Sequence, residues 1–217
     1  MKEILGSIVN LLIEQFLKKN TLWINHPNYI KVNLKSNLVK DVYIRENLIK
    51  AIRRYQIFLL ESTVDLNFTL ENKYRAICRI KTPNSIEDKI KRYNLSPHEY
   101  GEIPLFKCLN DLFGARIVLD GNLNFEEICN FLKNKDDFRD RNVQLRCNDA
   151  SKNGYKATHV YFKKCGDNSA FPWELQIWSA EDEENNIKSH KKYKQEYTKW
   201  EKQMVSKKEG KECSSII

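Results

Sequence analysis

Apolar residues recur at helical spacing in the first third of the chain. One side of the segment Met1–Phe16 carries Ile4, Leu5, Ile8, Leu12 and Phe16, which predicts an amphipathic helix. A second helix is predicted over Val42–Leu60, where the apolar positions are Ile44, Leu48, Ile49, Ile52 and Tyr55. We therefore expect the first seventy residues to be mainly helical.

Shorter apolar runs follow, and their length and alternation are typical of strands. They are Tyr74–Ile80, Ala115–Asp120, Val143–Cys147, Thr158–Lys163 and Trp173–Trp178. Helical patterns lie between them at Ser85–Tyr93 and Phe125–Lys133, and we expect Asn84 or Ser85, after Pro83, to cap the first of these helices. This order predicts an α+β (α/β mixed) fold, with a mixed β-sheet flanked by helices.

Length and composition are those of a globular protein with a full core. The chain has 217 residues, of which 41% are hydrophobic. No run approaches the length of a membrane span, and the N-terminal segment has acidic residues and no small-residue cleavage site, so it does not read as a signal peptide. The six cysteines are scattered along the chain and form no CxxC pair. This spacing favours reduced thiols in a cytoplasmic protein over a zinc site.

The charge balance favours an anionic partner. The net charge is +8, which suits nucleotide phosphates or nucleic acid, although lysine-rich surfaces also serve solubility alone. The stretch Lys188–Lys211 has nine lysines against three glutamates, with Tyr193, Tyr197 and Trp200 interleaved. It is either a solvated terminal helix or a strip that binds a phosphodiester backbone and stacks bases.

Three cations and a hydroxyl lie where a predicted strand passes into a helix. Arg79 and Lys81 are two apart on the strand and share a face, and Ser85 and Lys89 are four apart on the helix. Cations beside a helix N-terminus form a natural polyphosphate site.

A carboxylate and an arginine flank the next strand. Asp111 precedes an expected glycine turn at Gly114, and Arg116 is the lone charge in the strand that follows. A half-buried arginine needs an anionic partner. Either Asp111 and Arg116 form an internal ion pair, or Asp111 binds Mg²⁺ while Arg116 holds a phosphate.

The stretch Lys152–His159 combines a turn with an aromatic ring and cations. Gly154, between Asn153 and Tyr155, predicts a turn that presents Tyr155, Lys156 and His159 together. Glu174 and Gln176 then alternate with apolar residues, so they share one face of a strand. An aromatic platform beside a strand carboxylate indicates a base held near a metal or a proton acceptor.

Taken in order, these motifs resemble the synthetase domain of the RelA/SpoT family. They read Arg-x-Lys-x-x-x-Ser-x-x-x-Lys, then Asp-x-x-Gly-x-Arg, then Asn-Gly-Tyr-x-x-x-His, then Glu-x-Gln, over about residues 70 to 195. Those enzymes move the β,γ-pyrophosphate of ATP to a ribose 3′-hydroxyl, usually of GDP or GTP, and make the alarmone (p)ppGpp. The resemblance implies a nucleotidyltransferase-like sheet and a small stand-alone synthetase without a hydrolase domain. We expect a helical region over 1–70, the synthetase domain over 71–200 and a basic tail over 201–217, with helical extensions at both ends.

The resemblance also implies residue roles. ATP phosphates would be held by Arg79, Lys81, Ser85, Lys89 and Arg116. Mg²⁺ would be held by Asp111 and Glu174, and Glu174 would also take the proton of the attacking hydroxyl. The acceptor would be held by Tyr155, which stacks on the base, and by Asn153, Lys156, His159 and Gln176.

Two departures from the family pattern leave the acceptor open. Trp178 and Lys156 stand where the family commonly has arginine. A toxin branch, often encoded beside a neutralising antitoxin, pyrophosphorylates the 3′ CCA end of tRNA instead. The Lys188–Lys211 strip and Arg53–Arg54 would suit a tRNA backbone. A non-catalytic nucleotide- or RNA-binding relative is a third reading, weakened by the presence of both carboxylates and the tyrosine. The partner protein would be an antitoxin or a second copy of the chain.

Overall fold

The computed structural model describes residues 1–121, 123–134 and 141–189. The helices are α1 (Lys2–Ile24), η1 (Val39–Tyr43), α2 (Glu46–Ser62), α3 (Val64–Lys73), α4 (Pro83–Leu95), α5 (Leu105–Cys108), α6 (Phe125–Asn134) and η2 (Ala180–Asp182). The strands are β1 (Ala76–Ile80), β2 (Phe113–Leu119), β3 (Val143–Asp149), β4 (Thr158–Lys164) and β5 (Trp173–Ser179). Residues 183–189 are also helical.

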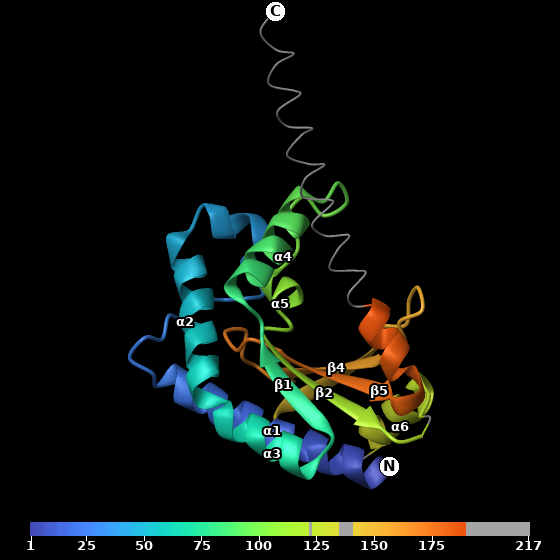
Figure 1. Cartoon of the computed structure of the whole chain (residues 1–217). Helices are drawn as coiled ribbons and strands as arrows, with labels where there is room; N and C mark the ends of the chain where they lie inside the picture. The colour runs from blue at the N-terminus through green and yellow to red at the C-terminus, as the bar shows by residue number, and fades with distance from the viewer. Residues whose placement is uncertain (122, 135–140, 190–217) are drawn as a thin grey trace, which may run out of the picture.

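The five strands form one mixed sheet in the order β1-β2-β5-β4-β3. Only β2 and β5 run parallel to each other, and the other neighbours pair antiparallel. The predicted α+β fold with a mixed sheet flanked by helices is confirmed (Figure 1). Each predicted strand agrees with an observed one to within a few residues at either end.

Alternation along the strands gives the sheet two different faces. Trp173, Leu175 and Ile177 of β5 point into the hydrophobic core, whereas Glu174 and Gln176 lie between them in sequence and point to the other face. Helix α1 packs on the core face, where the ring centroid of Phe16 lies 5.5 Å from that of Trp173. In Figure 1, α1 and α3 lie along this side, while α4 and residues 183–189 rise from the opposite side.

The helical predictions hold in type but not at every boundary. Helix α1 continues past Phe16 to Ile24, because Trp23 is buried against Tyr55 and Phe58 of α2. Ile4, predicted for the buried side, is 48% exposed. The second helix begins at Glu46 and not at Val42, since Val39–Tyr43 forms a separate 3-10 turn.

The N-terminus of α4 is capped by a residue that the sequence interpretation did not select. Thr82 is the N-cap, and its Oγ1 accepts a hydrogen bond from the backbone amide of Ser85. Pro83 occupies the first helical position, where its missing N–H leaves no hydrogen bond unmade. The prediction of Asn84 or Ser85 as the cap is therefore wrong.

Three further features bear on the sequence predictions. No helix among the described residues is long and apolar enough to cross a membrane. The described cysteines are all free thiols, and the described part of the chain has no group of three His, Cys, Asp or Glu residues placed to hold a metal. Of the Lys188–Lys211 strip, only Lys188 and Ser189 lie within the described residues, and Lys188 pairs with Glu184 at 2.6 Å.

Candidate active site

The strand register places the predicted residues in two rows on the face opposite α1. In the first row, Arg79, Gly114, Glu174 and Tyr161 are successive partners across β1, β2, β5 and β4. In the second row, Ile77, Arg116, Gln176 and His159 are successive partners across the same strands. Residues two apart on a strand share a face, so the two rows lie side by side.

Gly114 lies inside β2 and not in a turn, so the expected glycine turn is wrong. A Cβ on Gly114 would lie 3.9 Å from Glu174 Oε2 and 4.0 Å from Arg79 Nε. The missing side chain leaves the surface open between a carboxylate and a guanidinium.

Asp111 lies just before β2 and is held by two lysines. Its Oδ2 is 2.6 Å from Lys81 Nζ and its Oδ1 is 2.9 Å from Lys89 Nζ, and Lys89 also donates to Asn110 Oδ1 at 3.2 Å. Burial alone would raise the pKa of Asp111, but Lys89 and Lys81 outweigh burial and lower it to about 2. The internal Asp111–Arg116 ion pair that the sequence left open is not formed.

The two lysines respond differently to the same carboxylate. Burial and the neighbouring cations lower the pKa of Lys81, even though Asp111 opposes this change. Burial acts the same way on Lys89, but there Asp111 prevails and raises the pKa. The two lysines differ because Lys81 also lies near Arg79 and Lys89, whose positive charges add to burial in lowering its pKa.

Glu174 is buried and surrounded by hydrogen-bond partners. Its Oε1 lies 3.0 Å from His159 Nδ1, and its Oε2 accepts a hydrogen bond from Gln176 Nε2 at 2.8 Å. Burial favours the neutral acid, but His159 and then Gln176 favour the carboxylate, so the pKa of Glu174 is lowered. Burial also raises the pKa of Tyr161, which hydrogen-bonds to Glu174.

Six side chains form a closed ring of contacts on this face. Gln176 Oε1 accepts from Arg116 Nε at 3.3 Å and from Arg116 Nη2 at 3.1 Å. Tyr155 OH lies 3.0 Å from His159 Nε2 and accepts from Trp178 Nε1 at 3.1 Å. Arg116 Cζ stacks 3.7 Å above the Trp178 ring, which closes the ring. In order, the ring runs through Arg116, Gln176, Glu174, His159, Tyr155 and Trp178.

The donors and acceptors of this ring fit one tautomer of His159. Tyr155 OH accepts from the Trp178 indole, so its own hydrogen is available to His159 Nε2. His159 Nδ1 then carries the ring hydrogen and donates it to Glu174. In this arrangement both ring nitrogens of His159 have a hydrogen-bond partner.

The turn before Tyr155 has the conformation that its sequence demands. Asn153 and Gly154 have φ of 53° and 84°, and the backbones of Lys152 and Tyr155 exchange two hydrogen bonds across them. Asn-Gly is favoured where both central residues need positive φ. The turn places the Tyr155 ring beside His159, as predicted.

Three predicted residues make no side-chain hydrogen bond or ion pair with the ring or with Asp111 in the described part of the chain. Asn153 is exposed at the tip of the turn, and Lys156 Nζ pairs with Asp182 Oδ1 at 3.2 Å. Ser85 is exposed in the first turn of α4, where it accepts a hydrogen bond from Thr82. The structure therefore gathers Tyr155, His159 and Gln176, but not Asn153 and Lys156, around Glu174.

The sequence interpretation missed two contributors to the site. Tyr161 is two residues after His159 on β4, so strand alternation was a sufficient signal for it. Asn186 accepts from the Lys156 amide and donates to the Lys156 carbonyl, both at 2.8 Å, and so fixes the segment after the Tyr155 turn. No pattern in the sequence around Asn186 predicts that it contacts the Lys156 backbone.

The fold and this face define an α+β protein that presents two carboxylates among several cations on one side of a mixed sheet. Residues 78–198 match the family model described as a region found in RelA / SpoT proteins. The chain belongs to the RelA/SpoT family.

Several solved structures are similar to the chain. A GTP pyrophosphokinase family protein from Streptococcus pneumoniae is 20% identical, with 65% of this chain and 77% of that chain covered and a TM-score of 0.44. Small alarmone synthetase 1 from Bacillus subtilis is 19% identical, with 66% and 81% covered and a TM-score of 0.43. The same protein bound to its product pppGpp is 15% identical, with 71% and 96% covered and a TM-score of 0.42. A comparison with curated proteins found no match.

Proposed function

We propose that the protein is a pyrophosphokinase that transfers the β,γ-pyrophosphate of ATP to the ribose 3′-hydroxyl of GDP or GTP. Family membership supports the reaction class. The observation that carries the proposal is the position of Asp111, clamped by Lys81 and Lys89 on the face that also bears Glu174. Phosphoryl-type transfer needs mainly positioning and charge neutralisation, which these groups supply.

The cations would bind the ATP phosphates. Lys81 and Lys89 neutralise Asp111 in the nucleotide-free protein, and a polyphosphate offers both ammonium groups a second anion. Arg116 donates from Nε and Nη2 to Gln176. Its Nη1 has no hydrogen-bond partner in the part of the chain that the structure describes, and it would donate to a phosphate oxygen. Arg79, which is exposed at the β1 end of the first row of side chains, would also bind the ATP phosphates. Ser85 would bind them from the N-terminus of α4.

Asp111 and Glu174 have the chemistry of a magnesium site. Both are carboxylates, and the charge of Asp111 acts on the pKa of Glu174, so they lie within electrostatic reach of each other. Mg²⁺ is usually bound by one or two carboxylates together with substrate phosphates, so this pair fits it. The ion would neutralise charge that develops on the transferring group.

The acceptor would lie over the ring of six side chains. The Tyr155 ring would stack on the base, a contact that contributes about 1–3 kcal/mol. His159 and Gln176 would line the same pocket, and Asn153 and Lys156 would reach it from the turn. Glu174 would accept the proton of the attacking hydroxyl, since its contacts with His159 and Gln176 keep it ionised.

A second acceptor, the 3′ end of tRNA, is favoured by one specific feature. The Lys188–Lys211 strip carries nine lysines against three glutamates, which suits a long phosphodiester backbone better than a single nucleotide. In that case the protein would act as a translation-blocking toxin with an antitoxin partner. Arg53 on α2 already pairs with Glu87 at 2.9 Å, so it adds less to this argument than the strip does.

The decisive experiment is a transfer assay with ATP labelled in its terminal phosphate and Mg²⁺. GDP, GTP and deacylated tRNA are offered separately, and Glu174→Gln serves as the inactive control. The exposed Glu71→Gln on α3 is the matched control that should keep full activity. Label on GDP or GTP supports the first proposal, and label on tRNA supports the second. Transfer to none of the three by the folded protein would leave only a non-catalytic binding role.

A further inference from the structure

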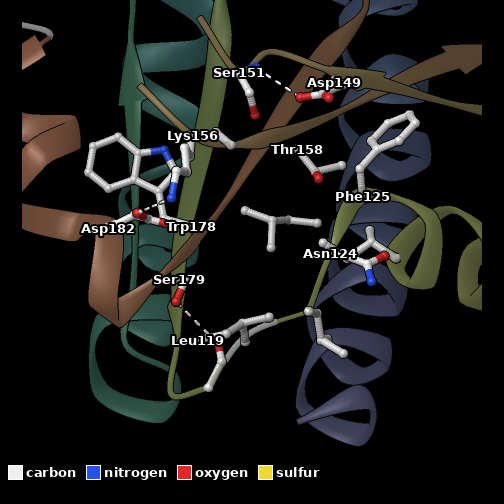
Figure 2. Close-up of a pocket in the computed structure, with 15 residues that line it drawn as sticks. Leu119, Asn124, Phe125, Asp149, Ser151, Lys156, Thr158, Trp178, Ser179 and Asp182 are labelled. Carbon is white, nitrogen blue, oxygen red and sulfur yellow. Dashed lines mark hydrogen bonds and ion pairs between the residues drawn. The ribbon is translucent and has the colours of Figure 1, made fainter. Parts of the chain in front are cut away.

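The segment that follows β5 lies against the Tyr155 turn, residues 152–156. The residues of this segment that meet the turn are Asp182, Asn186 and Ser189. Their spacing of four and then three residues places them on one side of a helical segment. Figure 2 shows Asp182 paired with Lys156 beside the Trp178 ring. At the tip of the turn, a Cβ on Gly154 would lie 3.7 Å from Ser189 Oγ.

Asn186 supplies the hydrogen bonds between the segment and the turn. Its side-chain oxygen accepts from the Lys156 amide and its nitrogen donates to the Lys156 carbonyl, both at 2.8 Å. Within the described part of the chain, no other group bonds to this amide or this carbonyl. A primary amide presents a donor and an acceptor in one plane, so Asn186 pairs with the Lys156 backbone much as a neighbouring strand would. Asn186 is also fully buried.

The Tyr155 ring rests on a small hydrophobic cluster and not on the main core. The cluster consists of Val118, Ala157 and Trp178, and Tyr155 and Ala180 pack against it. Ala180 is the first residue of the segment after β5, so this segment also contributes to the support of the ring. A small cluster at the edge of a domain can open at a lower free energy than the whole protein unfolds. The conformation of the turn therefore depends on local contacts.

Ion pairs anchor the same segment to the sheet. Arg75, which precedes β1, pairs with Glu183 at 2.6 Å and with Asp120 at 3.2 Å. Arg75 is exposed, as is Lys156 in its pair with Asp182, and exposed ion pairs contribute little to stability. Loss of a buried hydrogen-bond partner costs more. Asn186 is thus the contact that contributes most to holding the turn.

We propose that Asn186 is a positioning residue for the acceptor, which acts by holding the Tyr155 turn in the conformation that receives the base. The inference rests on the transfer reaction proposed above. A turn that is already ordered loses little freedom when the acceptor binds, so loss of the hold should weaken acceptor binding. Lys81 and Lys89, which would bind ATP, are held by Asp111 and not by this turn.

The first test is Asn186→Asp, which keeps the size of the side chain and the acceptor for the Lys156 amide. It replaces the donor by a second oxygen that faces the Lys156 carbonyl. The acceptor KM should rise about tenfold, while kcat and the KM for ATP stay nearly unchanged. The acceptor is GDP, GTP or deacylated tRNA, whichever the parent chain uses.

The matched control is Asn72→Asp on α3. It also removes an amide donor to a backbone carbonyl, that of Phe68 at 2.8 Å, but on an exposed residue. The control should leave all three kinetic constants unchanged. Equal rises in the KM for acceptor and the KM for ATP with Asn186→Asp, or no rise in either, would overturn the proposal.

A double-mutant cycle tests whether Asn186 acts through Tyr155. Tyr155→Ala removes the proposed stacking platform and should itself raise the acceptor KM. Asn186→Asp should then add little to that rise, because there is no ring left to position. Fully additive effects of the two substitutions would contradict a role through Tyr155.

Hydrogen exchange tests the hold on the turn without any transfer reaction. In the parent chain the Lys156 amide should exchange more slowly than the amides of Asn153 and Gly154, which have no hydrogen-bond partner among the described residues. In Asn186→Asp the Lys156 amide should exchange about tenfold faster, with the β5 amides unchanged. Equal exchange at Lys156, Asn153 and Gly154 in the parent chain would overturn the proposal. A parent chain that transfers to no acceptor would instead overturn the proposed function, and exchange alone would then decide whether Asn186 holds the turn.

Discussion

His159 and Glu174 meet diagonally across β4 and β5, with Nδ1 of the histidine 3.0 Å from Oε1 of the glutamate. The contact has two consequences. It keeps a buried carboxylate ionised, and through Nε2 it links that carboxylate to the Tyr155 hydroxyl. The proposed base and the proposed stacking platform are thus parts of one hydrogen-bonded unit.

Replacement of His159 by Phe should move the acid limb of the pH–rate profile to higher pH. His159 lowers the pKa of Glu174, and without it burial dominates and the pKa rises, so Glu174 becomes protonated at a higher pH. The measurement is kcat/KM for the transfer reaction against pH. His98→Phe, an exposed histidine, is the control. An unchanged acid limb would mean that Glu174 does not act as the base.

Glu174→Gln should lower kcat by a factor of about 10²–10⁴, the usual contribution of a positioned general base. The amide can still accept a hydrogen bond from Gln176, so the fold and ATP binding should be retained. Single-turnover rates together with ATP affinity by calorimetry separate the two effects. Full turnover by this variant would remove both roles assigned to Glu174.

Asp111 should make folding stability depend on pH in the acid range. Its pKa is about 2 in the folded protein, below the ordinary value of 3.8, so its stabilising effect is present above pH 4 and is lost as pH falls towards 2. A difference of this size is worth about 2 kcal/mol. Thermal unfolding of the parent chain and of Asp111→Asn across this range measures it. The variant should lack this part of the pH dependence and be less stable at neutral pH, because Lys81 and Lys89 lose their shared partner.

Strand alternation and motif order were enough to predict most of the fold and the pairing of Glu174 with Gln176. They failed where a contact comes from a distant segment. Lys81 and Lys89 were both assigned to phosphate, and only the three-dimensional packing reveals that they also neutralise Asp111. Trp178 was noted in the sequence only as a missing arginine. Its contacts with Arg116 and Tyr155 depend on the β2–β5 pairing and the Tyr155 turn together, which no local pattern encodes.

Trp178→Phe should weaken acceptor binding more than ATP binding. Phenylalanine keeps an aromatic face under Arg116 but removes the Nε1 donor to Tyr155 OH. The loss of one hydrogen bond predicts a rise in acceptor KM of about fivefold, with the KM for ATP nearly unchanged. Equal rises in both constants, with an unchanged melting temperature, would mean that Trp178 does not act through Tyr155.

The salt dependence of the transfer reaction should identify the acceptor. A tRNA backbone docked along the lysine strip releases many counterions, so kcat/KM would fall by orders of magnitude between about 50 and 200 mM salt. A GDP or GTP held in a pocket presents only a few phosphates to the protein. With these acceptors, kcat/KM would therefore change far less with salt concentration. The strip supplies the matched variant, in which Lys191, Lys192 and Lys194 are replaced by Gln. These changes should flatten the salt response only if tRNA is the acceptor, because a small nucleotide has no backbone to reach them. A shallow response that the triple variant leaves unaltered would assign the chain to guanine nucleotides and give the strip no part in the reaction.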